Sequence, residues 1–392
     1  MNTNLSFCYD RLQVDGTGYA NLAKSGLKWQ EWDFHWPRTV KIRILKFFKN
    51  NDYSYKETSV DESESGSWYP IGISWFDFDC DYLGLIPAKT LNKIKNGDLK
   101  ILFYYHEGDN PYRIKERLEF LCEKYMMPEN CYLFISANTA ANNIENFVYF
   151  NDHESFFASI NRRQSSNIAV NKKRLYDFTA LSRAHKWWRA TCILDLKRHN
   201  ILTNSIWSYH SNCDIEDSFE NNPIDFSEIK MDHNDLKDFV NSGPYVYDKN
   251  FEKHNDHRFV NLDPLKQSYF NLVIETHFDA DQSNGVFLTE KTFKPIKFGQ
   301  PFIIIGTANS LKLLRSAGYK TFDSVIDNSY DSIENNTERW KAVRNTILSI
   351  KKESPEKLFE KCYADIIHNQ YHFTHRIKEN LNYIIKEINC RR

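Results

Sequence analysis

The feature that most constrains the fold is a strand, a helix and a second strand joined by short turns. Residues 100–105 (KILFYY) form a short apolar, aromatic run that is typical of a buried strand. Residues 112–124 repeat apolar side chains at the spacing of one helix face. Residues 131–136 (CYLFIS) indicate another buried strand, and 147–150 indicate a further short one. Buried strands joined through a helix favour a parallel sheet and an α/β fold.

The same pattern returns near the end of the chain. Residues 269–275 (YFNLVIE) predict a strand, residues 289–298 a helix, and residues 301–305 (PFIII) a second strand. Gly299 fits the C-terminal cap of that helix. Pro295 lies beyond the first turn, so we expect it to kink or restart the helix.

Further elements follow from periodicity and turn residues. We predict strands at 39–48, 174–181 and 204–209, a helix opening at 182–189 and reaching about His199, a helix at 307–317, an irregular acidic region at 212–250, and mostly helix from Asn335 onward, with Ser354 capping a helix at Pro355 and a last helix at 376–389.

The length of the chain favours two hydrophobic cores. It has 392 residues, of which 41% are hydrophobic and 15% aromatic, which is too apolar for a disordered chain. A polar, Ser- and Asn-rich stretch at 156–171 predicts a junction. We therefore expect an N-terminal lobe at 1–165, a second α/β lobe at 166–353 and C-terminal helices at 354–392.

Charge and cysteine usage exclude several classes of protein. Lys and Arg number 51 against 52 Asp and Glu, which lacks the basic excess of a generic nucleic-acid binder. The eight cysteines are scattered without a CxxC pair, which indicates reduced thiols and argues against a zinc site. The N-terminus has no apolar core of a signal peptide. We expect a soluble, cytoplasmic protein.

Thr289-Glu290-Lys291 is the first candidate for a ligand site. A helix start presents free backbone N–H groups and a positive dipole end, which suit phosphate. Thr289 can cap, Lys291 can add charge beside a diphosphate, and Glu290 can accept from a sugar hydroxyl. An ordinary capped helix with solvated charges is the alternative. Glu275, at the end of the preceding predicted strand, is a candidate for donor binding.

Two further sets could carry chemistry. Arg183, Lys186 and Arg189 are three residues apart at a strand-to-helix turn, so they can share a helix face and hold a diphosphate, or form a solvated basic face. Glu107, between His106 and Asp109, follows a buried strand and could act as a general base.

The spacing Asp77, Asp79 and Asp81 is a weak candidate for a divalent cation. We expect that no metal ion is required. The motifs HExxH, GxxxxGK[ST] and GxSxG do not occur, which argues against zinc proteases, P-loop proteins and α/β-hydrolases.

The run FLTEKTFKPIKFGQPFIIIGTANSLKLLRSAGYKTF, residues 287–322, resembles the donor-binding part of α1,3-fucosyltransferase-like enzymes. It is most similar to the glycosyltransferase-like proteins of phage and marine viruses. The preceding YFNLVIET resembles the strand that leads into this motif. Upstream, LSRAHKWWRATCILDL resembles the arginine-bearing segment of the family, with Ser182 where asparagine is usual. The resemblance covers roughly 174–327, with 212–250 unmatched.

This resemblance implies a GT-B-like fold of two Rossmann-like lobes facing across a cleft, and metal-independent hexosyl or pentosyl transfer from a nucleotide-sugar. By position, Lys291 would contact the diphosphate and Glu290 the ribose or donor sugar. Arg183 or Arg189 would stabilise the leaving phosphate. The family uses a first-lobe carboxylate as base, for which we choose Glu107 without a motif match.

The acceptor stays open. One alternative is a glycan or lipid-linked sugar, and another is a hydroxymethylated DNA base. DNA would require a basic surface, for which the sequence offers Lys41, Arg43, Lys46, Lys49, Arg162 and Arg163. A non-catalytic nucleotide-sugar-binding protein on the same fold is a rival from another class. The oligomeric state is not predicted.

Overall fold

The chain forms two compact units, each with its own sheet. The computed structural model describes residues 2–10, 44–73, 76–160, 173–211, 219–247, 260–279 and 284–391. Unit 1 comprises Met1–Phe156, Ser283–Gly285 and Arg376–Arg392, and unit 2 comprises Phe157–Gln282 and Val286–His375. Each unit is described by itself.

Unit 1 is built on a six-stranded parallel sheet with the order β2-β1-β3-β4-β5-β6. Its strands are β1 (Asn2–Tyr9), β2 (Ser54–Ser59), β3 (Ser67–Ile73), β4 (Leu99–Tyr105), β5 (Tyr132–Ser136) and β6 (Phe147–Tyr149). The residues of β4 are buried on both faces, as a central parallel strand requires. This explains why its sequence reads as a continuous apolar run.

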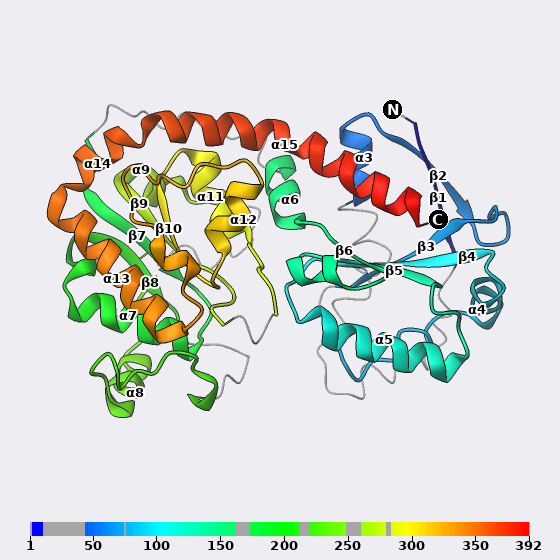
Figure 1. The fold of residues 1–392 in the computed structure, drawn as a ribbon, viewed down its shortest axis with the longest axis horizontal. Coiled ribbons are helices and arrows are strands. Elements are labelled where there is room, and N and C mark those ends of the chain that lie inside the picture. The colour runs from blue at the N-terminus through cyan, green and yellow to red at the C-terminus, as the bar shows by residue number, and fades with distance from the viewer. Residues whose placement is uncertain are drawn as a thin grey trace. The chain divides into compact units, whose positions relative to one another are not determined.

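Helices cover the sheet of unit 1 on both sides. They are α3 (Lys46–Asn50), α4 (Ala88–Lys95), α5 (Pro111–Tyr125) and the 3₁₀ helix η3 (Thr139–Asn143), and α6 (Asp152–Ile160) leads into unit 2. Ile114, Leu118 and Leu121 of α5 join one core cluster with Ile101 and Phe103 of β4. Figure 1 shows α5 on one side of this sheet and the C-terminal part of α15 on the other.

Unit 2 contains a four-stranded parallel sheet with the order β10-β9-β7-β8. Its strands are β7 (Tyr176–Ser182), β8 (Ser205–Tyr209), β9 (Ser268–Ile274) and β10 (Phe302–Ile305). The helical segments are α7 (Trp187–Arg198), η4 (Ile201–Asn204), η5 (Phe219–Asn221), α8 (His233–Asn241), α9 (Leu262–Gln267), α11 (Glu290–Phe298), α12 (Ser310–Ser316), η7 (Ser329–Ser332), α13 (Asn336–Glu353) and α14 (Pro355–Lys361). Figure 1 shows these helices gathered around the sheet.

The helical C-terminus is confirmed, although its last helix is longer than predicted. Residues predicted to begin a helix at Arg376 belong to α15 (Tyr363–Cys390). Its predicted apolar stripe is buried: Ile377, Leu381, Ile384, Ile385 and Ile388. Ser354 precedes α14 as predicted, but its side chain makes no capping hydrogen bond. None of the described helices is both long and apolar enough to cross a membrane.

The α/β class and the parallel sheets are confirmed, and both units are compatible with Rossmann-like lobes. The units nevertheless divide the chain differently from the expected 1–165, 166–353 and 354–392. The first boundary lies after Phe156, and the C-terminal residues are shared, with 354–375 in unit 2 and 376–392 in unit 1. Contacts distant in sequence decide this division, and local composition does not report them.

Two predicted elements were wrong. The predicted strand at 39–48 is helix α3 over Lys46–Asn50, while 39–43 lie outside the described residues. The region 212–250, predicted to be irregular, contains α8, whose N-terminus carries a capping box between Asp232 and Asp235. The buried side chains Leu236 and Phe239 attach this helix to the core of unit 2.

Candidate functional site

The candidate site lies where the strand order of unit 2 reverses. From β7 the chain continues to its neighbour β8, whereas from β9 it continues to β10 on the opposite side. The carboxyl ends of β7 and β9 therefore flank the switch point, where open parallel sheets bind ligands. Residues 183–189 follow β7, and residues 275–277 follow β9. Most of the predicted donor-side residues fall in these two segments or at the start of α11.

Glu275 is the centre of a hydrogen-bond network that holds the start of α11. Its side chain is almost completely buried, with 1% of the residue exposed. Oε1 accepts from the backbone N of Thr289 at 3.1 Å and from Thr292 Oγ1 at 2.6 Å. Oε2 accepts from Thr276 N at 3.1 Å and from Thr289 Oγ1 at 2.7 Å. Both carboxylate oxygens thus have internal partners, and a buried anion faces the positive end of a helix.

Thr289 caps α11 as the sequence predicts. Its backbone is extended, and its Oγ1 accepts from Lys291 N at 3.4 Å. Gly299 ends the helix at φ 71°, in the left-handed region that glycine favours. Pro295 lies inside the helix, which runs on through it to Phe298, so the predicted restart does not occur.

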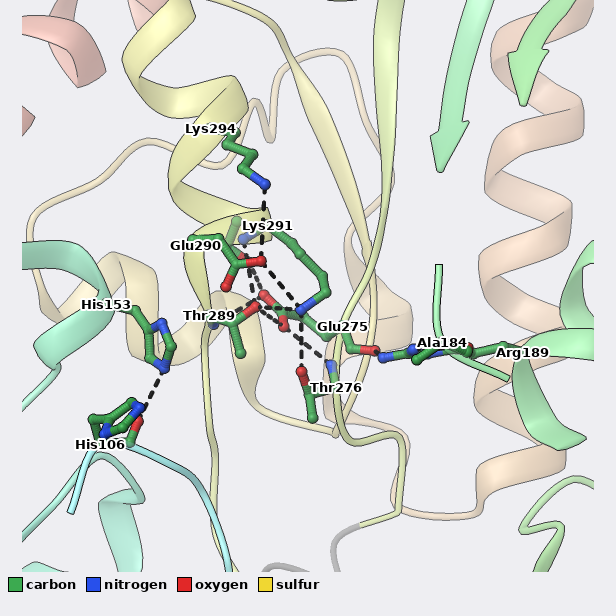
Figure 2. A network of polar contacts seen from close by, with 11 residues as sticks. His106, His153, Ala184, Arg189, Glu275, Thr276, Thr289, Glu290, Lys291 and Lys294 are labelled. Atoms are coloured by element: carbon green, nitrogen blue, oxygen red, sulfur yellow. Dashed lines mark hydrogen bonds and ion pairs between the residues drawn. The ribbon is translucent and has the colours of Figure 1, made fainter. Parts of the chain in front are cut away.

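Three cations gather around Thr276. Lys186 Nζ donates to the backbone O of Thr276 at 3.0 Å, and Lys291 Nζ donates to Thr276 Oγ1 at 3.2 Å. Arg189 Nη2 donates to the backbone O of Glu275 at 2.6 Å. Figure 2 shows Lys291 meeting Thr276, Thr289 and Glu290, with Arg189 reaching Glu275 from the other side. We call Lys186, Arg189 and Lys291 the cation cluster.

The members of the cation cluster differ in exposure. Arg189 is 4% exposed, and its Nη1 donates to Ala184 O at 3.1 Å, so the protein itself fixes this guanidinium. Lys186 is half-buried, and 32% of the Lys291 side chain is exposed. Glu290 Oε1 lies 3.5 Å from Lys291 Nζ and 3.8 Å from Lys294 Nζ. Lys186 and Lys291 are therefore the members of the cation cluster that a ligand can reach.

The prediction that Arg183, Lys186 and Arg189 share a helix face is wrong. Helix α7 begins at Trp187 with Lys186 as its N-cap, so only Arg189 lies within it. Arg183 is exposed in the turn that follows β7. Lys186 and Arg189 nevertheless donate to neighbouring backbone carbonyls, those of Thr276 and Glu275, just after β9.

His277 is the residue of this site that the sequence interpretation missed. Burial first, and then the charges of Lys186, Arg189 and Lys291, lower the pKa of His277 from 6.5 to about 3. Its imidazole is therefore neutral near pH 7. Its position directly after β9 at the switch point was the available signal.

The candidate base lies in unit 1. Glu107 follows β4, with 25% of its side chain exposed, and its Oε1 lies 3.4 Å from His106 Nε2. The backbone O of His106 contacts His153 Nε2 at 2.9 Å, a bond that Figure 2 also draws. Asp109 accepts a hydrogen bond from the hydroxyl of Tyr105. Within unit 1, Glu107 is thus an accessible carboxylate beside an imidazole.

The weaker candidates have local contacts. Asp81 accepts from Lys124 Nζ, Tyr125 OH and Gly84 N, and Asp77 accepts from Asp79 N. Among the described residues, no group of three or more His, Cys, Asp or Glu side chains could hold a metal ion. Cysteines 8, 80, 122, 131, 192 and 362 are buried free thiols, and Cys390 is exposed.

The basic surface expected for a DNA acceptor is only partly described. Lys41, Arg43, Arg162 and Arg163 lie outside the described residues, as does Cys213. Lys46 and Lys49 lie on α3.

Comparisons with known proteins assign no family to the chain. No protein-family model matches the chain, and no curated protein or solved structure matches it.

Proposed function

We propose that this chain is a glycosyltransferase that moves a sugar from a nucleotide-sugar donor to an acceptor hydroxyl, with inversion and without a metal ion. The observation that carries the proposal is the cation cluster at the switch point of the unit 2 sheet. Ligands bind at such points, and clustered cations suit a diphosphate. The GT-B-like arrangement implied by the resemblance, with the donor on unit 2 and the acceptor on unit 1, belongs to the same proposal.

The residues of unit 2 would divide the work on the donor. Lys186 and Lys291 contact the diphosphate oxygens, since their ammonium groups are the accessible members of the cation cluster. Arg189 acts on the diphosphate through its positive charge. The backbone O atoms of Ala184 and Glu275 hold its guanidinium in place. Because these groups are fixed before the reaction, they stabilise negative charge on the leaving diphosphate without reorganising. Glu290 accepts a hydroxyl of the ribose or the donor sugar.

Glu107 would act as the general base. It takes the proton of the acceptor hydroxyl while that oxygen attacks the anomeric carbon from the face opposite the nucleotide. The bond from the anomeric carbon to the diphosphate oxygen breaks, and the nucleoside diphosphate leaves with the electron pair. His106, 3.4 Å from the Glu107 carboxylate, can orient it.

The donor site is tested by replacing Lys186 or Lys291 with alanine. Each loses a charge-assisted hydrogen bond of about 1.5–3 kcal/mol, which corresponds to roughly 10- to 100-fold weaker nucleoside-diphosphate binding. Isothermal calorimetry measures this change, after a thermal-shift screen across nucleotides and nucleotide-sugars has found the donor. The matched control is Lys357→Ala, which removes an exposed lysine on α14. Unchanged affinity in both site variants would sink the assignment.

The base is tested separately with Glu107→Gln. General-base catalysis contributes about 10²–10⁴-fold, so sugar transfer should fall by at least 100-fold while donor binding stays at the wild-type level. Initial rates with the identified donor and a panel of glycan, lipid-linked and hydroxymethylated DNA acceptors measure the change. A wild-type chain that binds the donor and transfers to none of them would instead favour a non-catalytic binding protein.

A further inference from the structure

His277 leaves a buried hydrogen-bonding atom unused. It lies two residues beyond Glu275, and its ring packs against Phe287 with 5.7 Å between the ring centroids. Its Nδ1 atom is buried and makes no hydrogen bond with any of the described residues. Such an atom forfeits the hydrogen bond that it would make with water, and native proteins rarely leave one without a purpose. A bound ligand is one way to supply the partner.

The charged groups around His277 indicate which chemical group the ligand carries. Lys186, Arg189 and Lys291 act on its imidazole, yet they donate to the backbone of Glu275 and Thr276 and to the Thr276 hydroxyl. These three positive charges attract anionic oxygen. They also disfavour a proton on both ring nitrogens, so the ring keeps one N–H and one lone pair. Beside an anion, the favoured tautomer directs its N–H toward the negative oxygen.

We propose that His277 is a phosphate-binding residue, whose neutral imidazole donates a hydrogen bond from Nδ1 to an oxygen of a diphosphate held by Lys186 and Lys291. This inference rests on the proposed function, because it takes the same site to hold a diphosphate. It adds a ligand contact from the end of β9 to those from α7 and α11. The contact brings directional binding without adding a fourth positive charge to the cation cluster.

The test exploits the shapes of two amides. The amide nitrogen of asparagine falls near the position of imidazole Nδ1, whereas that of glutamine falls near Nε2. Binding of inorganic pyrophosphate is measured by calorimetry at pH 7.5 for the wild type and for His277→Asn, His277→Gln and His277→Ala. We expect alanine and glutamine to weaken binding about 10-fold or more, and asparagine to stay within about threefold of the wild type.

The outcomes distinguish a failure of the role of His277 from a failure of the proposed function. If the wild type binds neither pyrophosphate nor any nucleoside diphosphate, the proposed function fails. If the wild type binds and His277→Ala binds equally well, only the role of His277 is overturned. Equal weakening by asparagine and glutamine overturns the assignment to Nδ1. Should the alanine variant not fold, the asparagine and glutamine variants decide, with far-UV circular dichroism confirming that each is folded.

Discussion

At the scale of single residues, Glu275 holds the start of α11 from the end of β9. Its carboxylate accepts four hydrogen bonds, from Thr276 N, Thr289 N, Thr289 Oγ1 and Thr292 Oγ1. An anion in this position also complements the positive end of the helix. Any effect of Glu275 on a donor therefore acts through Thr289 and Lys291, which makes it a positioning residue.

Glu275→Gln should destabilise unit 2. The amide group replaces an acceptor by a donor, so at least one of the four bonds becomes donor against donor and a buried group loses its partner. The expected loss is about 1–3 kcal/mol in the free energy of unfolding. Urea denaturation measures it, with the exposed Glu360→Gln on α14 as the control. A variant as stable as the wild type would mean that these hydrogen bonds make no net contribution to the free energy of unfolding.

His277 should make stability depend on pH. Its pKa is lowered from 6.5 to about 3 in the folded chain, so between these values the unfolded chain binds more protons. The contribution of His277 to the free energy of unfolding is therefore complete above about pH 6.5 and is lost progressively as the pH falls toward 3. Urea denaturation at pH 7, 6 and 5 measures the slope. His277→Asn, which does not titrate, should show a shallower slope, and an identical slope in both proteins would contradict the prediction.

The sequence anticipated which residues carry charge at the site but not how they are used. Thr289 and Lys291 are neighbours in sequence, so a helix-start argument was enough to place them together. The carbonyls at the end of β9 that accept from Arg189 and Lys186 lie 86 and 90 positions away in the sequence. Only the pairing of β7 with β9 brings them into reach, and periodicity does not encode which strands pair.

At the scale of elements, buried apolar runs gave the strand predictions that succeeded, although β3, which is buried throughout, was not predicted. Strands β4, β5, β9 and β10 are buried on nearly every residue, and each appeared in the sequence as an apolar run between turn residues. The strand expected at 39–48 was wrong, because the apolar pairs Ile44–Leu45 and Phe47–Phe48 also fit one helix face. All four side chains are buried there.

Cys122 in α5 and Cys131, directly before β5, carry a pair of thiols that should cross-link. Cys122 Sγ lies 3.9 Å from Cys131 Sγ, and the hydrogen bond from Cys131 lowers the pKa of Cys122. With oxidised glutathione, the Cys122 thiolate should attack one sulfur and release one glutathione thiol. Cys131 should then attack the mixed disulfide and release the second. Two cysteine thiols are oxidised and one disulfide is reduced.

Mass spectrometry of peptides from the glutathione-treated, alkylated protein measures the cross-link. The wild type should show Cys122 joined to Cys131, whereas Cys131→Ser should stop at a glutathione adduct on Cys122. Cys362, buried in unit 2 and without a thiol neighbour among the described cysteines, serves as the internal control. Full alkylation of both thiols after unfolding would contradict the prediction.

At the scale of the whole molecule, the two units have separate cores. One buried cluster includes Trp188, Phe270 and Trp340 of unit 2, and the other includes Ile71, Phe103 and Phe134 of unit 1. Chain length predicted two cores, but the sequence did not show that residues 376–392 return to unit 1. Helix α15 is continuous across that boundary, so no turn residue marks it.

Arg376 is the residue of α15 through which this returning segment can be tested. Its Nε lies 3.0 Å from Glu154 Oε1, and Asn380 Nδ2 donates to Glu154 Oε2 at 2.9 Å. Glu154 is 4% exposed, so Arg376→Ala removes the cation beside a buried carboxylate. Breaking such a pair costs about 3–5 kcal/mol. Because all three residues belong to unit 1, the loss should fall on that unit.

Hydrogen exchange followed by mass spectrometry resolves the two units in one experiment. In Arg376→Ala, peptides from β3, β4 and β5 should exchange faster, while those from β7, β9 and β10 keep their protection. Pyrophosphate affinity, which we propose depends on Lys186 and Lys291 in unit 2, should stay at the wild-type level. The double variant Arg376→Met with Glu154→Gln should restore most of the protection, since it leaves no unpaired charge in a buried position. Equal loss of protection in β4 and β9 would instead mean that both units unfold as one cooperative body.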